Sequence, residues 1–310
     1  MKRKAIVLLM TIGFITLISA LVLVSLSISK RSFDEVVYLD ARNQFNVVFK
    51  DFITMMKTNS KKIKKDDELD VLLSLFLPAM KEPKTGIEFG FDLESKMGKL
   101  NINYLLSSMV GDENDVNRTV LELPFEKYFA KYSIKEPRTL ISILLDTIDK
   151  DDLERATYSE IAANDYDFTE GRIYSYKHLK KIFDYYYKRT KDNNIFKINR
   201  DNFEESFYFG DTNRSKQFFD CDKAEISTLN LMSENDILDS DSFCAQFIKP
   251  EDASLKKLKD IYNFSDFNKS NQYLIQCSIT FNNENFNRNV RFDYDLKTGR
   301  VDNIDKNFQE

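Results

Sequence analysis

Glycine and proline are scarce in this sequence, with 8 Gly and 5 Pro in 310 residues. Average proteins contain roughly 7% glycine and 5% proline, so a fold built mainly of tight hairpins would lack the residues that turns require. Hydrophobic residues nevertheless make up 42% of the chain and include 26 Phe and 15 Tyr. This composition excludes general disorder and predicts a packed fold that is rich in helix.

Residues that carry catalysis are also scarce. His178 is the only histidine, and the sequence contains no Gly-x-Ser-x-Gly segment and no phosphate-binding glycine loop. An enzyme needs a nucleophile, a base and an orienting group that can converge, and no such set is visible. His178 lies in an aromatic and basic segment, which is typical of a surface residue. We therefore expect a protein that is not an enzyme.

The chain has 3 cysteines, Cys221, Cys244 and Cys277, all in its last third. No Cys-x-x-Cys spacing or cysteine–histidine pairing suggests zinc or a redox centre. In an oxidising compartment two of these cysteines can form a disulfide, and the spacing permits every pairing. We favour Cys221 with Cys244, because Cys277 lies in a strand-like run and is expected to be buried.

One segment, Ala5–Ser29, contains no charged residue and is rich in Leu, Ile and Val. As a helix it would span about 37 Å, more than the roughly 30 Å of a bilayer core. Lys2, Arg3 and Lys4 precede it, and the positive-inside tendency predicts that they stay in the cytoplasm while the bulk of the chain is exported. A cleaved signal peptide is the alternative, but its apolar region usually covers only about 7–15 residues. We expect a retained single-pass anchor.

The helix is expected to continue beyond the anchor. Residues 32–57 contain no Pro or Gly, and apolar residues recur among them at helical spacing. The apolar stripe includes Phe45, Phe49 and Phe52, which we expect to bind the helices of partner proteins. Both stretches together would form one rod of about 80 Å. On periodicity alone, a membrane helix followed by a separate amphipathic helix is the alternative.

The exported part of the chain is acidic. Without Lys2, Arg3, Lys4, Lys30 and Arg31, 40 Lys and Arg remain against 50 Asp and Glu, a net charge of −10. A surface that binds nucleic acid must be basic to match the phosphates. The charge therefore excludes nucleic acid as a partner.

Beyond the rod the pattern changes from strand to helix and back to strand. Gly86–Leu93 and Lys99–Tyr104 predict a hairpin around the turn at residues 96–98. Pro137 is well placed for the first turn of one helix, and Tyr176–Lys191 predicts another. The whole region from 107 to 200 is expected to be mainly helical.

The C-terminal part predicts a small antiparallel sheet. Tyr273–Phe281 and Asn289–Tyr294 are strand-like, and Asp295–Gly299 forms a turn into a short final strand. The expected divisions are a basic leader and membrane helix (1–29), its amphipathic continuation (30–58), a linker with the hairpin (59–106), a helical insert (107–200) and a divergent segment with the final strands (201–310).

Three segments resemble the K-type minor pseudopilins of type II secretion, the general secretion pathway protein K family. Lys2–Lys4, running directly into the apolar helix, is similar to the leader of that family. Gly98–Asn103 resembles its Gly-(Lys/Arg)-x-Asn-Leu-Asn strand. Leu145–Asp152 resembles its Leu-Asp-Trp-Ile-Asp-x-Asp segment, and Ser175 and Leu179 follow where the family has a Ser-Leu-x-Glu-Leu helix.

The resemblance implies an α+β, type IV pilin-like fold, in which the long N-terminal helix packs on a small antiparallel sheet with a mainly helical insert domain. It implies a minor pseudopilin that caps or initiates the pseudopilus tip in protein export across the outer membrane. The implied partners are other minor pseudopilins, the inner membrane and secreted substrates, and the bulk of the chain would be periplasmic. A minor pilin of a type IV pilus, or a membrane-anchored periplasmic adaptor protein, is the alternative.

The N-terminus departs from the family pattern. Lys4 stands where family members have Gly before the prepilin-peptidase cleavage point, so processing is left open. Gly13 begins a second motif of this kind, but an apolar run precedes it instead of a basic leader, so we interpret Gly13 as an ordinary membrane-helix glycine. Ordinary pilins carry Glu five residues into the mature chain, and Leu9 or Ile18 stands there instead. In the family, that absence marks the tip subunit.

An acidic cluster is the candidate metal site. Asp146 and Asp149 share a helix face near the expected end of their helix, where the macrodipole disfavours negative charge. A hard cation would relieve this repulsion, and Asp151, Asp152 and Glu160 could supply further oxygen ligands. The resemblance likewise implies Ca²⁺ in this insert. A solvated acidic loop is the alternative.

Overall fold

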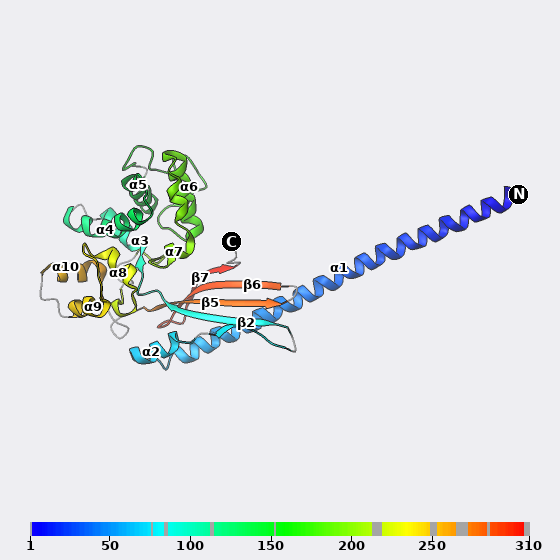
Figure 1. Ribbon diagram of the computed structural model, residues 1–310, viewed down its shortest axis with the longest axis horizontal. Coiled ribbons are helices and arrows are strands. Elements are labelled where there is room, and N and C mark those ends of the chain that lie inside the picture. Colours follow the sequence, from blue (N-terminus) through cyan, green and yellow to red (C-terminus); the bar gives the residue numbers. More distant parts are fainter. Residues whose placement is uncertain are drawn as a thin grey trace.

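The structure is a computed structural model. It describes residues 2–75, 77–83, 86–111, 115–151, 153–212, 219–248, 253–264, 272–283 and 286–306. Side chains of the first helix are described at Ser19 and from Val22 onward. The molecule is elongated, with one long helix at one end and a group of helices at the other (Figure 1).

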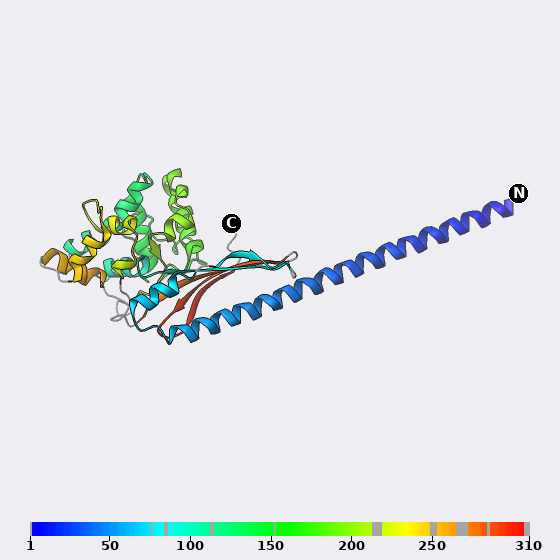
Figure 2. The ribbon, with the colours of Figure 1, turned by 60° about the horizontal axis from the view of Figure 1, so that its bottom comes forward.

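Helix α1 (Lys2–Ser60) runs without interruption through the point where the predicted membrane helix and its continuation meet. Its second half lies along the sheet, and its first half projects away from the rest of the molecule in both views (Figures 1 and 2). The prediction of one continuous rod is confirmed.

No helix among the described side chains is both long enough and apolar enough to cross a membrane. Most of Ala5–Ser29 lies outside those side chains. The membrane anchor therefore stays a prediction.

A five-stranded antiparallel sheet packs against α1 in the order β1-β2-β5-β6-β7. Its strands are β1 (Leu77–Lys81), β2 (Glu88–Ser95), β5 (Leu274–Asn283), β6 (Phe286–Asp295) and β7 (Val301–Lys306). The chain leaves the sheet after β2 and returns at β5, directly beside it. The C-terminal strands agree with the prediction, and the long helix on an antiparallel sheet makes this a pilin-like α+β fold.

The predicted hairpin is wrong in its second strand. β2 pairs with β1 and β5, not with Lys99–Tyr104. Only β3 (Leu100–Asn101) is extended there; it pairs in parallel with β4 (Phe207–Tyr208), and helix α3 (Ile102–Gly111) follows at once. The alternating polar residues misled the prediction because Asn101 and Asn103 are buried along with their apolar neighbours.

The helical insert extends past residue 200, which corrects the predicted boundary. Its helices after α3 are α4 (Asp115–Lys131), α5 (Pro137–Ile148), α6 (Tyr176–Thr190), α7 (Arg200–Glu204), α8 (Ile226–Met232), α9 (Ser240–Ile248) and α10 (Ala253–Tyr262), with short 3-10 turns at Asn193–Lys197 and Cys221–Lys223. Helices α8 and α10 both contact α4, and α9 contacts α10. Helices α5 and α6 begin where the sequence predicted.

Two hydrophobic cores hold the molecule together. One lies between α1, the short helix α2 (Asp66–Leu73) and the sheet, and the other lies inside the insert. Each buried phenylalanine or leucine contributes about 1.5–3 kcal/mol. In the insert, Cys221 and Cys244 form a disulfide with a Cα–Cα distance of 5.6 Å, the pairing favoured from the sequence. Cys277 is free and buried in β5.

Candidate functional site

The predicted partner-binding phenylalanines face the protein's own sheet, so this assignment is wrong. Phe45 and Phe52 are 7% and 5% exposed. The ring centroid of Phe45 lies 5.7 Å from that of Phe281, and the Phe49 ring lies 5.3 Å from that of Phe292. Helical spacing reveals that one face of a helix is buried, but it does not reveal whether the cover is the same chain or another.

A different part of α1 offers an apolar surface. We call residues 22–36 the projecting segment. Its large hydrophobic side chains are between 51% and 68% exposed: Val22, Leu23, Val24, Leu26, Ile28, Phe33 and Val36. Tyr38 marks the start of the sheet contact, because its ring lies 5.5 Å from that of Phe286. Exposed apolar side chains gathered in this way are typical of a membrane or protein interaction site, and four exposed charged residues, Lys30, Arg31, Asp34 and Glu35, stand among them near the sheet end of the segment.

The Gly98–Asn103 segment, where the chain enters the insert, is tied to three later segments of the insert. Asn103 donates through Nδ2 to the carbonyl oxygens of Ile173 (2.9 Å) and Gly210 (2.8 Å), and its Oδ1 accepts from the Ile173 amide (2.7 Å). Asn101 Oδ1 accepts from the Gly210 amide at 3.1 Å. A Cβ on Gly98 would overlap the Lys223 carbonyl, which explains the glycine. These residues position chain segments of the insert.

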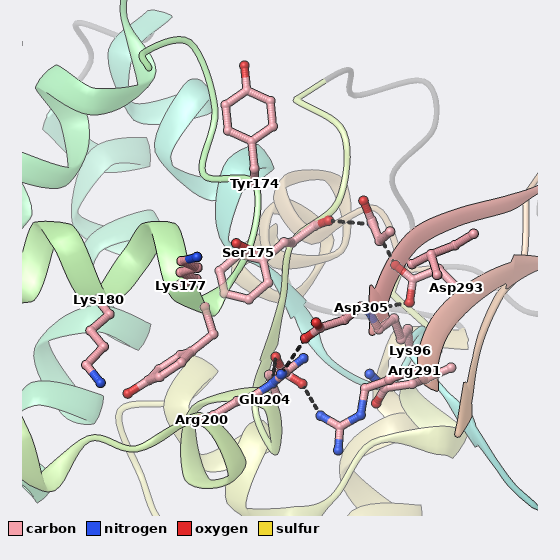
Figure 3. A pocket seen from close by; sticks show the side chains of 15 residues that line it. Lys96, Tyr174, Ser175, Lys177, Lys180, Arg200, Glu204, Arg291, Asp293 and Asp305 are labelled. Atoms are coloured by element: carbon pink, nitrogen blue, oxygen red, sulfur yellow. Dashed lines mark hydrogen bonds and ion pairs between the residues drawn. The ribbon is translucent and has the colours of Figure 1, made fainter. Parts of the chain in front are cut away.

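A cavity of about 560 Å³ lies where the insert meets the sheet (Figure 3). Ion pairs cross it: Arg291 of β6 reaches Glu204 of α7 at 2.5 Å, and Arg200 of α7 reaches Asp305 of β7 at 2.6 Å. Arg200 also pairs with Glu204 at 2.9 Å. In Figure 3 these four side chains point toward one another. The network joins α7 to the two last strands, so its role is to hold the insert on the sheet.

The same cavity contains no catalytic arrangement among the described residues that line it. Lys96 pairs with Asp293 at 2.6 Å, and both side chains are buried. Lys177 and Lys180 on the first turns of α6 are exposed at its rim. His178, predicted to be a surface residue, is half buried, with its ring 4.8 Å from that of Phe168. Burial and Lys181 lower the pKa of His178.

The predicted calcium ligands are only partly brought together. Asp146 and Asp149 are buried, and the Arg155 guanidinium pairs with both, at 2.5 Å from Asp146. Ser159 donates a further hydrogen bond to Asp146. An arginine thus supplies the positive charge that the sequence reasoning assigned to a metal ion.

Of the other three predicted ligands, Asp151 and Glu160 lie among the described residues. Asp151 is exposed and accepts a hydrogen bond from the Leu153 amide, and Asp152 lies outside the described residues. Burial and the neighbouring Glu170 raise the pKa of Glu160 to about 8. Glu160 Oε2 and Glu170 Oε1 are both buried, and a proton held between the two carboxyl groups satisfies them without a cation.

No three potential ligands among the described residues converge closely enough to hold a metal ion. The fit to calcium is therefore incomplete, and Ca²⁺ binding stays a prediction. A calorimetric titration of the protein with Ca²⁺ tests this binding. If Ca²⁺ released no heat and did not raise the melting temperature, the calcium site would be excluded.

A buried acid that the sequence did not reveal lies at the base of the insert. Asp220 is 3% exposed and accepts a hydrogen bond from the Tyr273 hydroxyl at 3.1 Å. Burial raises the pKa of Asp220 from 3.8 to about 6. Because the folded protein holds this proton more tightly than the unfolded chain, the contribution of Asp220 to stability falls as the pH rises from 3.8 to about 6.

Asp220→Asn is therefore expected to stabilise the protein at pH 7.5 by on the order of 2 kcal/mol and to leave stability at pH 4 nearly unchanged. Asparagine keeps an acceptor for Tyr273 and removes the buried charge. The matched control is Asp222→Asn, because Asp222 is exposed two residues away. Urea unfolding at both pH values measures the difference; an equal effect of the two substitutions would contradict the assignment.

The geometry defines a class of fold: a pilin-like α+β fold with a projecting helix and a large helical insert. Comparisons with known proteins add one likeness. No family model and no curated protein match the sequence. Among solved structures the chain is similar to a chain of the GspK-GspI-GspJ complex from the type 2 secretion system of enterotoxigenic Escherichia coli. The two share 10% identity over 76% of this chain and 83% of that chain, with a TM-score of 0.48.

Proposed function

We propose that this protein is a minor pilin-like subunit that assembles with other pilin-like subunits through α1, in the manner of a minor pseudopilin of type II secretion. The observation that carries the proposal is the division of α1 into two halves. The second half is covered by the chain's own sheet, whereas the projecting segment exposes Phe33 and Val36 at 68% and 64%. An isolated protein gains nothing from such a surface.

Two environments can cover the projecting segment. A bilayer covers apolar side chains from every side, and the charge-free run Ala5–Ser29 extends the same helix to the N-terminus. A bundle of equivalent helices covers them equally well, so the helix can pass from membrane to assembly while its apolar surface stays buried. In this arrangement the charge-free run of α1 lies in the inner membrane, and the rest of the chain lies in the periplasm.

The arrangement of the insert supports a terminal position in the assembly. The insert lies at the opposite end of the molecule from the N-terminus of α1 (Figure 1). A bulky domain there would be accommodated most easily above the last subunit of a filament. The missing pilin glutamate, with Leu9 in its place, supports the same position, and Ile18 in the second register is not a glutamate either. The proposed role is assembly and export, without catalysis.

Val36→Asp is expected to abolish co-purification with pilin-like subunits encoded by neighbouring genes, because a carboxylate cannot be buried unpaired among apolar helices. Val71→Asp is the matched control, since Val71 is 66% exposed on α2, away from the projecting segment. Both variants should fold like the wild type, which circular dichroism checks. Equal partner recovery from the two variants would contradict the proposal.

Loss of the gene separates the possible assemblies. A secretion pseudopilus predicts that exported proteins accumulate in the periplasm, whereas a type IV pilus predicts loss of surface fibres and twitching. If neither changes, a membrane-anchored adaptor becomes the better description.

A further inference from the structure

A large hollow in the insert lies at the end of the molecule opposite the N-terminus of α1 (Figure 1). A cavity of about 850 Å³ opens between α4, the loop that follows α8, and helices α9 and α10. Its lining includes the apolar side chains of Leu123, Ile237, Phe243 and Leu258. Helices α8, α9 and α10 occupy the end of the molecule opposite the N-terminus (Figure 1). This surface stays open when α1 is buried in a membrane or a helix bundle.

Leu238 stands in this lining and is 90% exposed. The residues on either side of it are fixed. Ile237 is 8% exposed, and its amide donates to Asn230 Oδ1 at 2.5 Å. Asp239 accepts from the Ser242 hydroxyl at 2.5 Å and from the Asp241 amide at 3.1 Å, which caps the start of α9. The loop therefore holds Leu238 in the solvent by defined contacts.

A lysine behind the loop adds to this rigidity. Lys127 of α4 donates to the carbonyl oxygens of Asn230 (3.0 Å), Ser233 and Glu234 (3.4 Å). These bonds close the end of α8 and fix the path of the chain into the loop. A leucine on a fixed loop loses little conformational entropy on binding, which favours a recognition role over a chance exposure.

The charged side chains that line the cavity are all acidic among the described residues. Glu234, Asp236 and Asp239 line it, and no lysine or arginine does so among its described residues. Asp239 is used as the helix cap, whereas Glu234 and Asp236 are exposed. An apolar floor with an acidic rim matches a ligand whose apolar side chains are flanked by positive charges.

We propose that this cavity, the Leu238 pocket, binds a short segment of another polypeptide in which leucine or phenylalanine is flanked by lysine or arginine. The apolar side chains enter the cavity beside Leu238, and the basic side chains meet Glu234 and Asp236. This site goes beyond the proposed assembly role, because it lies on the insert and leaves α1 free.

The test uses the full-length chain in phosphatidylcholine nanodiscs, with empty nanodiscs subtracted. The probe is a fluorescein-labelled peptide, acetyl-Lys-Leu-Lys-Phe-Leu-Lys-amide, and its binding is measured by fluorescence anisotropy. Two further peptides carry serine in place of the apolar residues or glutamate in place of lysine. We expect saturable binding of the first peptide and at least tenfold weaker binding of the other two.

The variants locate the site on the protein. Leu238→Ser and the double variant Glu234→Lys with Asp236→Lys should each weaken binding at least tenfold. The matched controls are Leu153→Ser, whose side chain is 75% exposed on another acidic loop, and Asp222→Lys with Glu225→Lys, both exposed. The controls should bind as the wild type does, and thermal melts check that every variant is folded.

Binding that ignores Leu238, or equal binding of the serine peptide, would overturn the proposal. Sedimentation that shows self-association dependent on Leu238 would also overturn it, because the occupant would then be a second copy of this chain. These results are independent of the Val36→Asp experiment, so failure of the pocket and failure of the assembly role are distinguishable.

Discussion

Phe52→Ala is expected to lower the free energy of unfolding by about 3–5 kcal/mol, the range found when phenylalanine is removed from a packed core. Phe52 is 5% exposed, and its ring centroid lies 5.3 Å from that of Phe91 and 6.2 Å from that of Phe292. Alanine would leave a cavity between α1 and the sheet that neighbouring rings fill only in part. Urea unfolding of the full-length chain, followed by circular dichroism, measures the loss.

Phe33→Ala is the matched control on the same helix. Phe33 is 68% exposed in the projecting segment, so its removal should change stability by less than about 0.5 kcal/mol. The same substitution should weaken partner recovery. Phe33→Ala is thus expected to affect partner binding and not stability, whereas Phe52→Ala is expected to affect stability. If Phe33→Ala unfolded the domain and Phe52→Ala did not, the division of α1 into a covered and a projecting half would be wrong.

Asn103→Ala is expected to cost about 3–5 kcal/mol, because each buried group left without a partner costs about 1–3 kcal/mol. The substitution removes the acceptor for the Ile173 amide and the donor for the carbonyl oxygens of Ile173 and Gly210. Asn103 is 0% exposed, so water does not replace these bonds without local opening. Hydrogen exchange should therefore rise sharply at the Ile173 amide.

Asn235→Ala serves as the control for Asn103→Ala, because Asn235 is an exposed loop residue of the same type. It should stay within about 0.5 kcal/mol of the wild type. An Ile173 amide that remained protected in Asn103→Ala, with stability unchanged, would show that the buried asparagine does not hold these segments of the insert together.

The fold was predictable where a single hydrophobic periodicity extends over many consecutive residues. The absence of Pro and Gly over residues 32–57, together with the 3.6-residue period, predicted the course of α1, and the alternation in Tyr273–Phe281 predicted β5. The prediction of a strand at Lys99–Tyr104 was wrong because the polar residues of this segment are buried rather than solvated. The predicted end of the insert at residue 200 was wrong because helices α8, α9 and α10 are short and have weak hydrophobic patterns. Contacts with α4 and the Cys221–Cys244 disulfide hold these helices in place.

The site was less predictable than the fold, because it depends on which residues meet in space. A stripe of Phe45, Phe49 and Phe52 has the same pattern whether its cover is a partner or the same chain. The acidic residues Asp146 and Asp149 suggested a metal, since nothing in the sequence showed that Arg155 turns back onto them. Leu238 gave no signal, because exposure of a single leucine in a polar loop has no period.

The insert enters and leaves the sheet at neighbouring strand ends, where Ser95 of β2 pairs with Ile275 of β5 and the Lys96 amide bonds to the Leu274 carbonyl at 3.0 Å. Both covalent connections of the insert to the sheet therefore lie at one place. A force pulling the insert away from the sheet would separate β2 from β5 one hydrogen-bonded pair at a time, starting at Ser95 and Ile275. The Arg291–Glu204 and Arg200–Asp305 bridges brace this junction from the far edge of the sheet and spread the strain over β6 and β7.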